Sequence, residues 1–282
     1  MRLALTALLA GAIALLPARI ATAMEAETLE IGIWPYISTQ EVLVFYKPLQ
    51  AYLEKRLQRP VLLVTAPDQK VFVERTQRGE YRFVITAPHY ARLAQKEAGY
   101  VPMLRAKRDQ SGVLLVEKNS PLRSVRELRG KTVTVPQRIT IIAMLSLQAL
   151  RANGLEPGRD VTVRYAASHN SAMLDVLRGE SAAVGASATV LDQMPAEIKG
   201  NFRPLAITGV VPPVMFLANP AVPTRETAEL TRIILDFAES TPEGRDFINR
   251  LGYIGFRPPT EKEMQSLDPY VAELKKLLSQ AQ

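Results

Sequence analysis

The sequence of 282 residues contains no cysteine and only two histidines. Without cysteine the chain has no disulfide, no thiolate metal site, no cysteine nucleophile and no lipid-modifiable cysteine. Catalytic motifs are also absent: no G-x-S-x-G, H-E-x-x-H or phosphate-binding-loop pattern occurs, and Gly32 is not followed by the glycines of a dinucleotide-binding fingerprint. Because an enzyme needs a nucleophile with a base, a metal set or paired carboxylates, we expect no catalytic activity.

Aromatic residues are also few, at 6% of the chain, and the basic residues are dispersed along it. Nucleic-acid binding favours clustered Lys and Arg interleaved with aromatic residues, so we expect no nucleic-acid partner. The formal charge is +7, and removal of a segment containing Arg2 and Arg19 would leave 33 basic against 28 acidic residues. This mild positive excess favours an anionic solute.

Long apolar runs are confined to the first residues, which have the pattern of a secretory signal peptide (1–23). Arg2 precedes an apolar run at 3–16, and an A-x-A cleavage site follows at 21–23. The run is shorter than the roughly 20 residues that span a bilayer, and Pro17 ends it. An uncleaved anchor is the alternative interpretation, but we expect an exported protein with no stable membrane insertion.

The rest of the chain alternates strand-like and helix-like segments, a pattern typical of α/β proteins with parallel strands. Three predicted strands, Leu29–Trp34, Val61–Thr65 and Phe83–Ile85, are each followed by a helical pattern, with Asp68 and Thr86 as expected caps. A second unit repeats the alternation, with predicted strands at 132–135, 161–165, 182–186 and 203–208. The C-terminal segment is predicted to be helical at 224–239, 242–251 and 261–278, with a break at Asp268-Pro269.

Two connecting stretches separate the units: the polar residues 107–111 and the Pro-rich residues 209–213. We interpret them as an outward and a return crossing. Residues 24–112 and 213–282 are therefore predicted to form lobe I, and residues 113–212 to form lobe II.

Three predicted strand-to-helix turns carry polar residues: Thr86 in the first unit, and Arg138–Thr140 and Ser168–Asn170 in the second. The first N–H groups of a helix lack partners within the helix and favour anions. Since ligands of open α/β sheets bind at the carboxyl ends of strands, these turns would converge on one cleft if the units face each other. His89 and His169 would then lie there too. Thr86 and Ser168 could equally serve only as helix caps.

The two histidines leave a metal site open as an alternative, and His169 could also be a neutral histidine at an interface. A metal usually needs three or four ligands, which methionines would have to complete. The methionines in question are Met103, Met144, Met173 and Met215, although methionines at helical spacing usually belong to a core.

Taken in order, several segments resemble the periplasmic binding proteins of the phosphate/phosphite/phosphonate type, the substrate-binding subunits of ABC importers. These segments are Leu29–Tyr36, Pro48–Leu57, Ala66-Pro67-Asp68, Ser124–Lys131, Ser168-His169-Asn170, Gly179-Glu180 and Gly244–Phe256. The resemblance covers nearly all of the chain after the leader. It implies a two-lobed type II periplasmic binding fold with two hinge crossings, closure around a ligand, and an ABC permease as partner. We expect a monomer without a cofactor.

The anion-binding run departs from this family. The family has a Ser-Thr-Ser-like run at the helix start, where this chain has Arg138, Ile139 and Thr140, followed by Ile141 in place of glycine. Arg138 could replace the lost hydroxyls by donating two parallel hydrogen bonds to an oxyanion. Alternatively it points to solvent, and Ile139 and Ile141 line a site for a less charged ligand.

Other matching positions are mixed. His169 keeps the family histidine, Gln69 replaces an aromatic residue, and Thr86 replaces a tyrosine, with Tyr90 one turn later. Thr189 replaces the acidic residue that would receive an amino group, so aminoalkyl phosphonates are disfavoured. The candidate ligand-binding residues are therefore Arg138, Thr140, His169 and Thr86, with Tyr36, Gln69, Tyr90, Ile139, Asn170 and Thr189 around them.

These observations predict a non-enzymatic, periplasmic solute-binding protein that closes on a small oxyanionic solute and delivers it to an inner-membrane permease. The alternative is a sensing module, in which the same fold reports ligand occupancy to a membrane sensor kinase.

Overall fold

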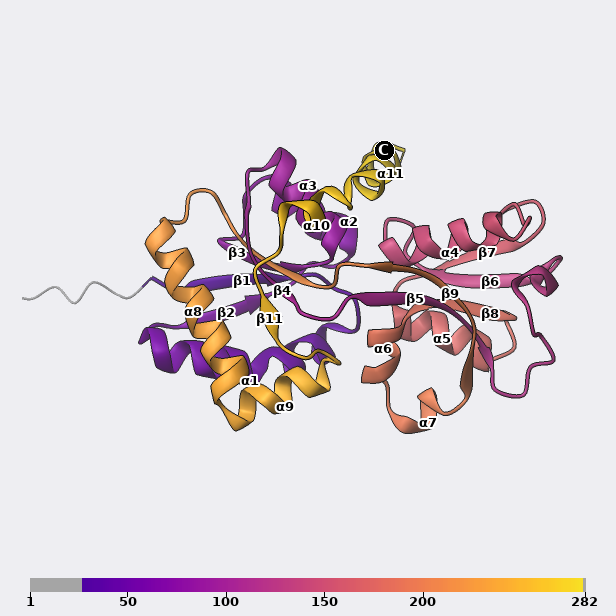
Figure 1. Ribbon diagram of the computed structural model, residues 1–282, viewed down its shortest axis with the longest axis horizontal. Coiled ribbons are helices and arrows are strands. Elements are labelled where there is room, and N and C mark those ends of the chain that lie inside the picture. Colours follow the sequence, from indigo (N-terminus) through magenta and orange to yellow (C-terminus); the bar gives the residue numbers. More distant parts are fainter. Residues whose placement is uncertain (1–26, 281–282) are drawn as a thin grey trace, which may run out of the picture.

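The protein, described by a computed structural model over residues 27–280, consists of two α/β lobes that lie side by side (Figure 1). The predicted signal peptide at 1–23 lies outside the described residues. Within residues 27–280, no helix has the length and apolarity that a membrane crossing requires.

Lobe I is built on a six-stranded sheet in the order β11-β4-β10-β3-β1-β2. Its strands are β1 (Leu29–Ile33), β2 (Val61–Val64), β3 (Phe83–Thr86), β4 (Val101–Ala106), β10 (Met215–Ala218) and β11 (Phe256–Arg257). β1 pairs in parallel with β2 and β3, whereas β10 runs antiparallel between β3 and β4. The chain therefore returns to the first sheet through β10, and β11 later adds its edge strand beside β4.

Lobe II contains a five-stranded sheet in the order β7-β6-β8-β5-β9. Its strands are β5 (Gln110–Glu117), β6 (Thr132–Pro136), β7 (Thr162–Ala166), β8 (Ala183–Ser187) and β9 (Phe202–Val211). β6 is parallel to β7 and β8, and β5 is antiparallel to β8 and β9. The predicted alternation is confirmed. However, β9 runs on to Val211, through residues expected to belong to the return crossing.

Helices cover both faces of each sheet (Figure 1). In lobe I, one group of packed helices consists of α1 (Thr39–Leu57), α8 (Thr224–Ser240) and α9 (Pro242–Arg250). A second group is centred on α3 (Pro88–Glu97), which contacts α2 (Gln69–Gln77), α10 (Glu261–Gln265) and α11 (Asp268–Ser279). Lobe II carries η1 (Val125–Leu128), α4 (Ile141–Ala152), α5 (His169–Leu177), α6 (Ala188–Gln193) and α7 (Ala196–Lys199). The break between α10 and α11 confirms the one predicted at Asp268.

Helix starts follow the capping rules at most of the predicted turns. The Asp68 side chain accepts from Val71 N at 2.8 Å, and Ser168 Oγ accepts from Ser171 N at 3.2 Å. The prediction that Thr86 caps α3 is wrong, because Thr86 is the last residue of β3 and Ala87 occupies the cap position. Pro88 provides the first turn instead, where its missing N–H costs nothing. Pro48 starts no new helix and lies inside α1.

α4 approaches the sheet of lobe II closely because two glycines face it. A Cβ on Gly185 would lie 2.3 Å from Ser146 Oγ, and one on Gly209 would lie 2.7 Å from Leu145 Cδ2. Both distances are shorter than packed atoms tolerate, so only glycine permits this contact. The contact fixes the axis of α4, whose first residues border the cleft described below.

The lobes are joined by two crossings. One runs from β4 to β5 through residues 107–109, and the other from β9 to β10 through residues 212–214. Gln110 pairs with Val211 in the ladder between β5 and β9, so the crossings lie next to each other. Two adjacent extended crossings are the arrangement expected of a hinge between rigid lobes.

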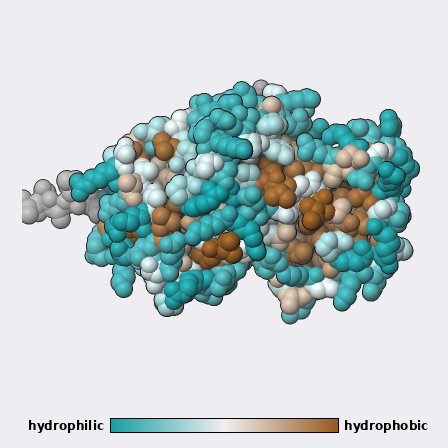
Figure 2. All heavy atoms as spheres, viewed as in Figure 1, coloured by the Kyte–Doolittle hydropathy of each residue, from teal (hydrophilic) through white to brown (hydrophobic). Residues whose placement is uncertain are grey.

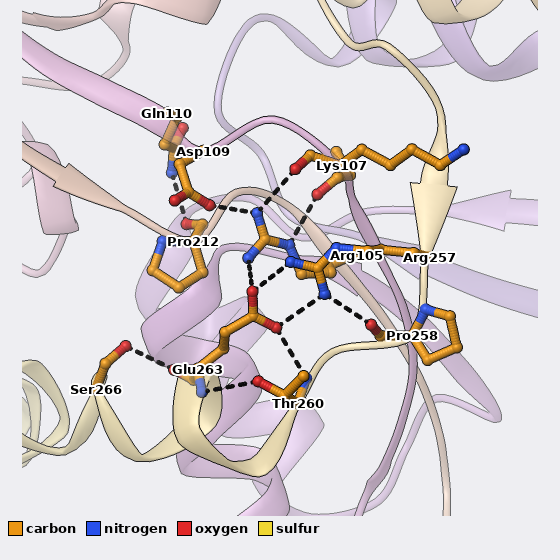
Figure 3. Close-up of polar contacts among 11 residues, drawn as sticks. Arg105, Lys107, Asp109, Gln110, Pro212, Arg257, Pro258, Thr260, Glu263 and Ser266 are labelled. Atoms are coloured by element: carbon orange, nitrogen blue, oxygen red, sulfur yellow. Dashed lines mark hydrogen bonds and ion pairs between the residues drawn. The ribbon is translucent and has the colours of Figure 1, made fainter.

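Arg105, at the end of β4, anchors the outward crossing (Figure 3). Its side chain is 1% exposed, and its guanidinium donates to Ala106 O at 2.8 Å and to Lys107 O at 3.4 Å. It also pairs with Asp109 within the crossing and with Glu263 of α10 at 2.6 Å. One buried cation thereby ties the crossing to the C-terminal helices.

Glu263 is shared by a second guanidinium, that of Arg257 in β11, whose Nη1 donates to Oε2 at 3.0 Å (Figure 3). Thr260 N donates to the same carboxylate oxygen at 2.8 Å. The hydrogen bonds from Arg257, followed by the contributions of Thr260 and the charge of Arg105, lower the pKa of Glu263 to about 2. The carboxylate is therefore ionised throughout the physiological range, as the network requires.

The visible surface is largely hydrophilic, but hydrophobic residues gather on the front of lobe II (Figure 2). The edge strand β9 contributes the exposed side chains of Ile207 and Val210. This surface lies on the outside of lobe II.

Candidate functional site

A cleft lies between the two lobes, where residues that follow β1, β3, β6, β7 and β8 meet those of the crossings and of the segment after α9. Its polar lining consists of Tyr36, Gln69, His89, Gln110, Thr140, His169, Ser187, Thr189, Gln193 and Tyr253. Its apolar lining consists of Trp34, Ala87, Pro88, Ile141, Ile142, Val190 and Val214. The cavity volume is about 50 Å³, measured as the space open to the centre of a water molecule. A site of this size suits a small solute.

Among the described residues, side chains that bond from one lobe to the other hold the cleft closed, and three of them are His89, Gln193 and Asn170. His89 Nε2 of α3 lies 2.9 Å from Ile139 O in lobe II. Gln193 Nε2 of α6 donates to Leu251 O in lobe I at 3.1 Å. Asn170 Nδ2 of α5 donates to Glu41 Oε2 of α1 at 3.1 Å. The structure therefore shows a closed arrangement of the lobes.

The lining of the cleft carries no formal charge. Among the residues that the structure describes, no Asp, Glu, Lys or Arg side chain lines it. Burial lowers the pKa of both His89 and His169 to about 4, so both rings are neutral at pH 7. Burial also raises the pKa of Tyr36 and Tyr253 well above the ordinary value of 10.0. A solute in this cleft therefore meets dipoles and hydrogen-bonding groups.

Three helices begin beside the cleft, and the N-terminus of each is the positive end of its helix dipole. Thr140 caps α4, its Oγ1 accepting from Ala143 N at 3.1 Å, and Ile141 and Ile142 form the first helical residues beside the cleft. His169 opens α5, and His89 is the second residue of α3. The first N–H groups of these helices are free of intrahelical partners and favour negative charge. Because Thr140 Oγ1 accepts the capping bond, its hydroxyl hydrogen can still be donated to a solute.

Aromatic rings form an apolar wall on the lobe I side. Trp34 and Tyr36 stack with ring centroids 4.5 Å apart and an angle of 24° between the ring planes. The ring of Tyr253 lines the same cleft. Rings and aliphatic side chains would surround a non-polar substituent on the solute.

Five of the predicted site residues line the cleft: Tyr36, Gln69, Thr140, His169 and Thr189. Tyr90 lies behind Gln69, and its hydroxyl donates to Gln69 Oε1 at 2.8 Å. With Oε1 engaged, the amide nitrogen is the end of Gln69 that can serve a solute.

Arg138 lies outside the lining of the cleft in this arrangement. Thr140 N donates to Gln137 O at 2.9 Å, which closes a turn with Arg138 on its outer side. The guanidinium is exposed and lies 5.9 Å from the centroid of the Tyr165 ring. Arg138 borders an outer groove beside α11 instead. Of the alternative, an exposed Arg138 and a lining Ile141 agree with the structure, whereas Ile139 does not line the cleft.

Three other predicted residues also lie outside the lining. Thr86 is fully buried at the end of β3, and Ile139 contributes its carbonyl to His89. Asn170 is occupied by Glu41. These positions therefore support the cleft from behind or join the lobes.

Both histidines line the cleft, where the convergence of the turns would place them, although His89 was not on the list of candidate ligand-binding residues. Gln193 and Tyr253 were not foreseen. Gln193 and Tyr253 lie in segments with no local motif, and only the packing of lobe II against α9 brings them to the cleft.

The metal alternative finds little support in the geometry. Residues 27–280 contain no group of three or more His, Asp or Glu side chains placed to hold a metal ion. None of Met103, Met144, Met173 and Met215 lines the cleft around the two histidines.

Comparison with known proteins gives a consistent family and fold. The sequence profile of the periplasmic substrate-binding proteins of phosphonate ABC transporters matches residues 31–264. No curated protein matches the chain by sequence. PhnD1 from Prochlorococcus marinus, solved with methylphosphonate, superposes with a TM-score of 0.79 at 16% identity, over 88% of this chain and 98% of that chain.

Two further solved structures share the fold. The Pseudomonas aeruginosa protein PA3383, a binding protein of an ABC phosphonate transporter, gives a TM-score of 0.74 at 12% identity, over 90% of this chain and 98% of that chain. XAC2383 from Xanthomonas citri, bound to chloride ion, gives 0.69 at 23% identity, over 88% and 99%. At these identities the structures establish a shared two-lobed fold.

Proposed function

The chain belongs to the family of periplasmic substrate-binding proteins of phosphonate ABC transporters, and we propose that it closes around a small oxyanion of the phosphite or phosphonate type and delivers it to an ABC permease. The observation that supports this proposal is the uncharged cleft between the lobes, which is lined by hydroxyl, amide and imidazole groups and bordered by the starts of α3, α4 and α5.

An uncharged cleft can still bind an anion, because helix dipoles and N–H donors act strongly in a site closed to water. The proposed donors are the first N–H groups of α4 and α5, the Thr140 hydroxyl and the Gln69 amide. They replace the guanidinium that the sequence suggested at Arg138. The aromatic wall of Trp34 and Tyr36 would receive a hydrogen or a small alkyl group on phosphorus.

Thr189 supports a restriction on this solute class. It lines the cleft, and no carboxylate of the described residues accompanies it. The ammonium group of an aminoalkyl phosphonate would lose its hydration without gaining a charged partner. We therefore propose that solutes without an amine are preferred.

The proposal includes export to the periplasm through cleavage of the segment 1–23, where a solute-binding protein would meet a permease of the inner membrane. A monomer suffices for this role, since both halves of the cleft belong to one chain. The described residues contribute no catalytic step to the proposal.

Titration calorimetry with phosphite, methylphosphonate, 2-aminoethylphosphonate and acetate tests the proposal. We expect binding of phosphite or methylphosphonate that is at least tenfold tighter than that of 2-aminoethylphosphonate or acetate. Thr140→Val should weaken that binding by about 1–2 kcal/mol through loss of one hydrogen bond to a charged group. Thr241→Val is the matched control, because Thr241 caps α9 in the same way, accepting from Gly244 N at 2.9 Å. Absence of binding to every phosphorus oxyanion would refute the function.

A further inference from the structure

The imidazole of His89 is held in one tautomer by the closure of the lobes. Its Nε2 lies 2.9 Å from Ile139 O, and a carbonyl oxygen can only accept, so Nε2 must carry the hydrogen. The hydroxyl of Tyr90 also lies 3.3 Å from Ile139 O, but its single hydrogen is directed to Gln69 Oε1 at the shorter distance of 2.8 Å. In the neutral ring, Nδ1 is consequently a lone-pair acceptor.

This acceptor is buried and unsatisfied. His89 is 0% exposed and lines the cleft, and its Nδ1 has no hydrogen-bond partner among the described residues. A buried polar atom without a partner is unfavourable, so a solute that supplies a donor recovers the lost hydrogen-bond energy. A solute oxygen carrying only lone pairs would instead face the lone pair of Nδ1.

Gln193 presents a second acceptor by the same logic. Its Nε2 donates to Leu251 O at 3.1 Å, which fixes the orientation of the amide, since the reverse orientation would place two carbonyl oxygens together. Its Oε1 is buried and has no partner in the described part of the chain. Both acceptors line the same cleft, and each is oriented by a bond that crosses between the lobes.

The groups around His89 leave it neutral. The Tyr90 ring centroid is 4.1 Å from that of the imidazole, and Tyr36, Tyr253 and His169 line the cleft with it. Burial raises the pKa of each of these tyrosines and lowers that of His169, so none of them is charged near neutral pH.

Several charged residues of the elements packed against α3 form ion pairs. α11 and α10 contribute Asp268 and Glu261, which pair with Arg92 at 2.9 and 3.2 Å. β4 contributes Arg105, which pairs with Glu263, and α2 contributes Lys70, which pairs with Glu74 at 3.8 Å. β10 carries no charged residue. None of these charged groups donates to Nδ1, which has no hydrogen-bond partner among the described residues.

We propose that the cleft selects the singly protonated form of its oxyanion, with the P–O–H group of the solute donating its hydrogen to Nδ1 of His89. The inference rests on the proposed function and narrows it to hydrogen-phosphonate or hydrogen-phosphite monoanions. A phosphonate dianion has no P–O–H hydrogen to donate. A sulfonate has no acidic hydrogen either, although it carries a single negative charge, like the phosphonate monoanion, throughout the pH range of the experiment. Gln193 Oε1 provides a second acceptor for a further donor of the solute.

The test compares methylphosphonate with methanesulfonate by calorimetry, since the two solutes have similar shape and differ in the acidic hydroxyl. At pH 7, methylphosphonate should bind at least tenfold more tightly. Above the second acid dissociation of the free phosphonate, its affinity should fall about tenfold per pH unit, whereas the affinity for methanesulfonate should stay constant. Equal affinities for the two solutes, or a phosphonate affinity that holds or rises with pH, would overturn the inference and leave the proposed function intact.

His89→Gln separates the two roles of the imidazole. The glutamine amide nitrogen can replace Nε2 as donor to Ile139 O. Its acceptor Oε1 is bonded to the same carbon as that nitrogen, so it lies away from the position of Nδ1, and no acceptor remains there. We expect the preference for methylphosphonate to fall to within about threefold of unity. Asn170→Ala is the control, because it removes a lobe-to-lobe bond outside the cleft lining and should weaken both solutes equally. An unchanged preference in His89→Gln would refute the assignment of His89, and failure of the wild-type protein to bind either solute would refute the proposed function itself.

Discussion

Acidification should weaken solute binding, because closure buries two histidines in their neutral form. In the closed arrangement the pKa of His89 and His169 is about 4, and burial is the cause. In an open arrangement we expect both rings to reach water and to have the ordinary pKa of about 6.5. The pKa of the closed state is thus the depressed one. The stabilisation of closure is complete above pH 6.5 and is lost as the pH falls toward 4.

The size of the effect follows from this pair of pKa values. Between pH 7 and pH 5, each histidine that becomes protonated only in the open form lowers the affinity about 20-fold, or close to 2 kcal/mol. Two independent histidines would together lower it by about 400-fold. This acid limb, combined with the alkaline limb expected for methylphosphonate, predicts a bell-shaped dependence of affinity on pH.

Calorimetry at pH 5, 6 and 7 with methylphosphonate measures the acid limb, with the affinity referred to the monoanion at each pH. His169→Asn should remove about half of the logarithmic loss, since asparagine does not titrate. An affinity that is flat or increases toward pH 5 would refute the reasoning. It would show that a histidine takes up a proton with the anion and acts as a cationic donor, in place of the neutral acceptor argued above.

Three further outcomes are expected. Arg138→Ala should leave the affinity for methylphosphonate within twofold by calorimetry, since its guanidinium lies outside the cleft over Tyr165; a loss above tenfold would contradict that placement. Thr189→Asp should raise the affinity for 2-aminoethylphosphonate relative to methylphosphonate about tenfold, and an unchanged ratio would show that residue 189 does not face the substituent. Arg105→Met should lower the free energy of unfolding by about 3 kcal/mol in urea, as expected when a buried ion pair loses one partner. Asp109→Asn should cost under about 1 kcal/mol, because Asp109 is 51% exposed; equal losses would refute the anchoring role of Arg105.

The alternation of strands and helices was predictable because each segment carries its own local signal. Val61–Thr65 is apolar, with three β-branched residues, is flanked by Pro60 and Pro67, and forms β2 (Val61–Val64). Asp68 and Ser168 mark the starts of their helices, because each side chain accepts a hydrogen bond from the backbone N–H three residues later. Such signals survive folding because tertiary packing reinforces them.

The site was less predictable because its geometry depends on non-local packing and on the direction of single side chains. The turn closed by Thr140 N and Gln137 O directs Arg138 outward, although its position in the sequence is next to the cleft. Gln193 is oriented in the cleft by its bond to Leu251 O, just after α9 of the other lobe. A sequence pattern indicates which loop borders a site, whereas the packed lobes determine which side chain of that loop faces it.

The bonds that close the lobes also determine what the cleft can recognise. His89 and Gln193 each use an N–H donor on a backbone carbonyl of the opposite lobe, and each therefore keeps its acceptor for the cleft. Before closure both groups could turn, and the imidazole could exchange tautomers, so neither would discriminate strongly between donors and acceptors. Closure and selectivity are thus linked through the same two side chains. A substitution that preserves the carbonyl bond while removing the acceptor should leave closure intact and abolish only the selectivity, which makes the link experimentally separable.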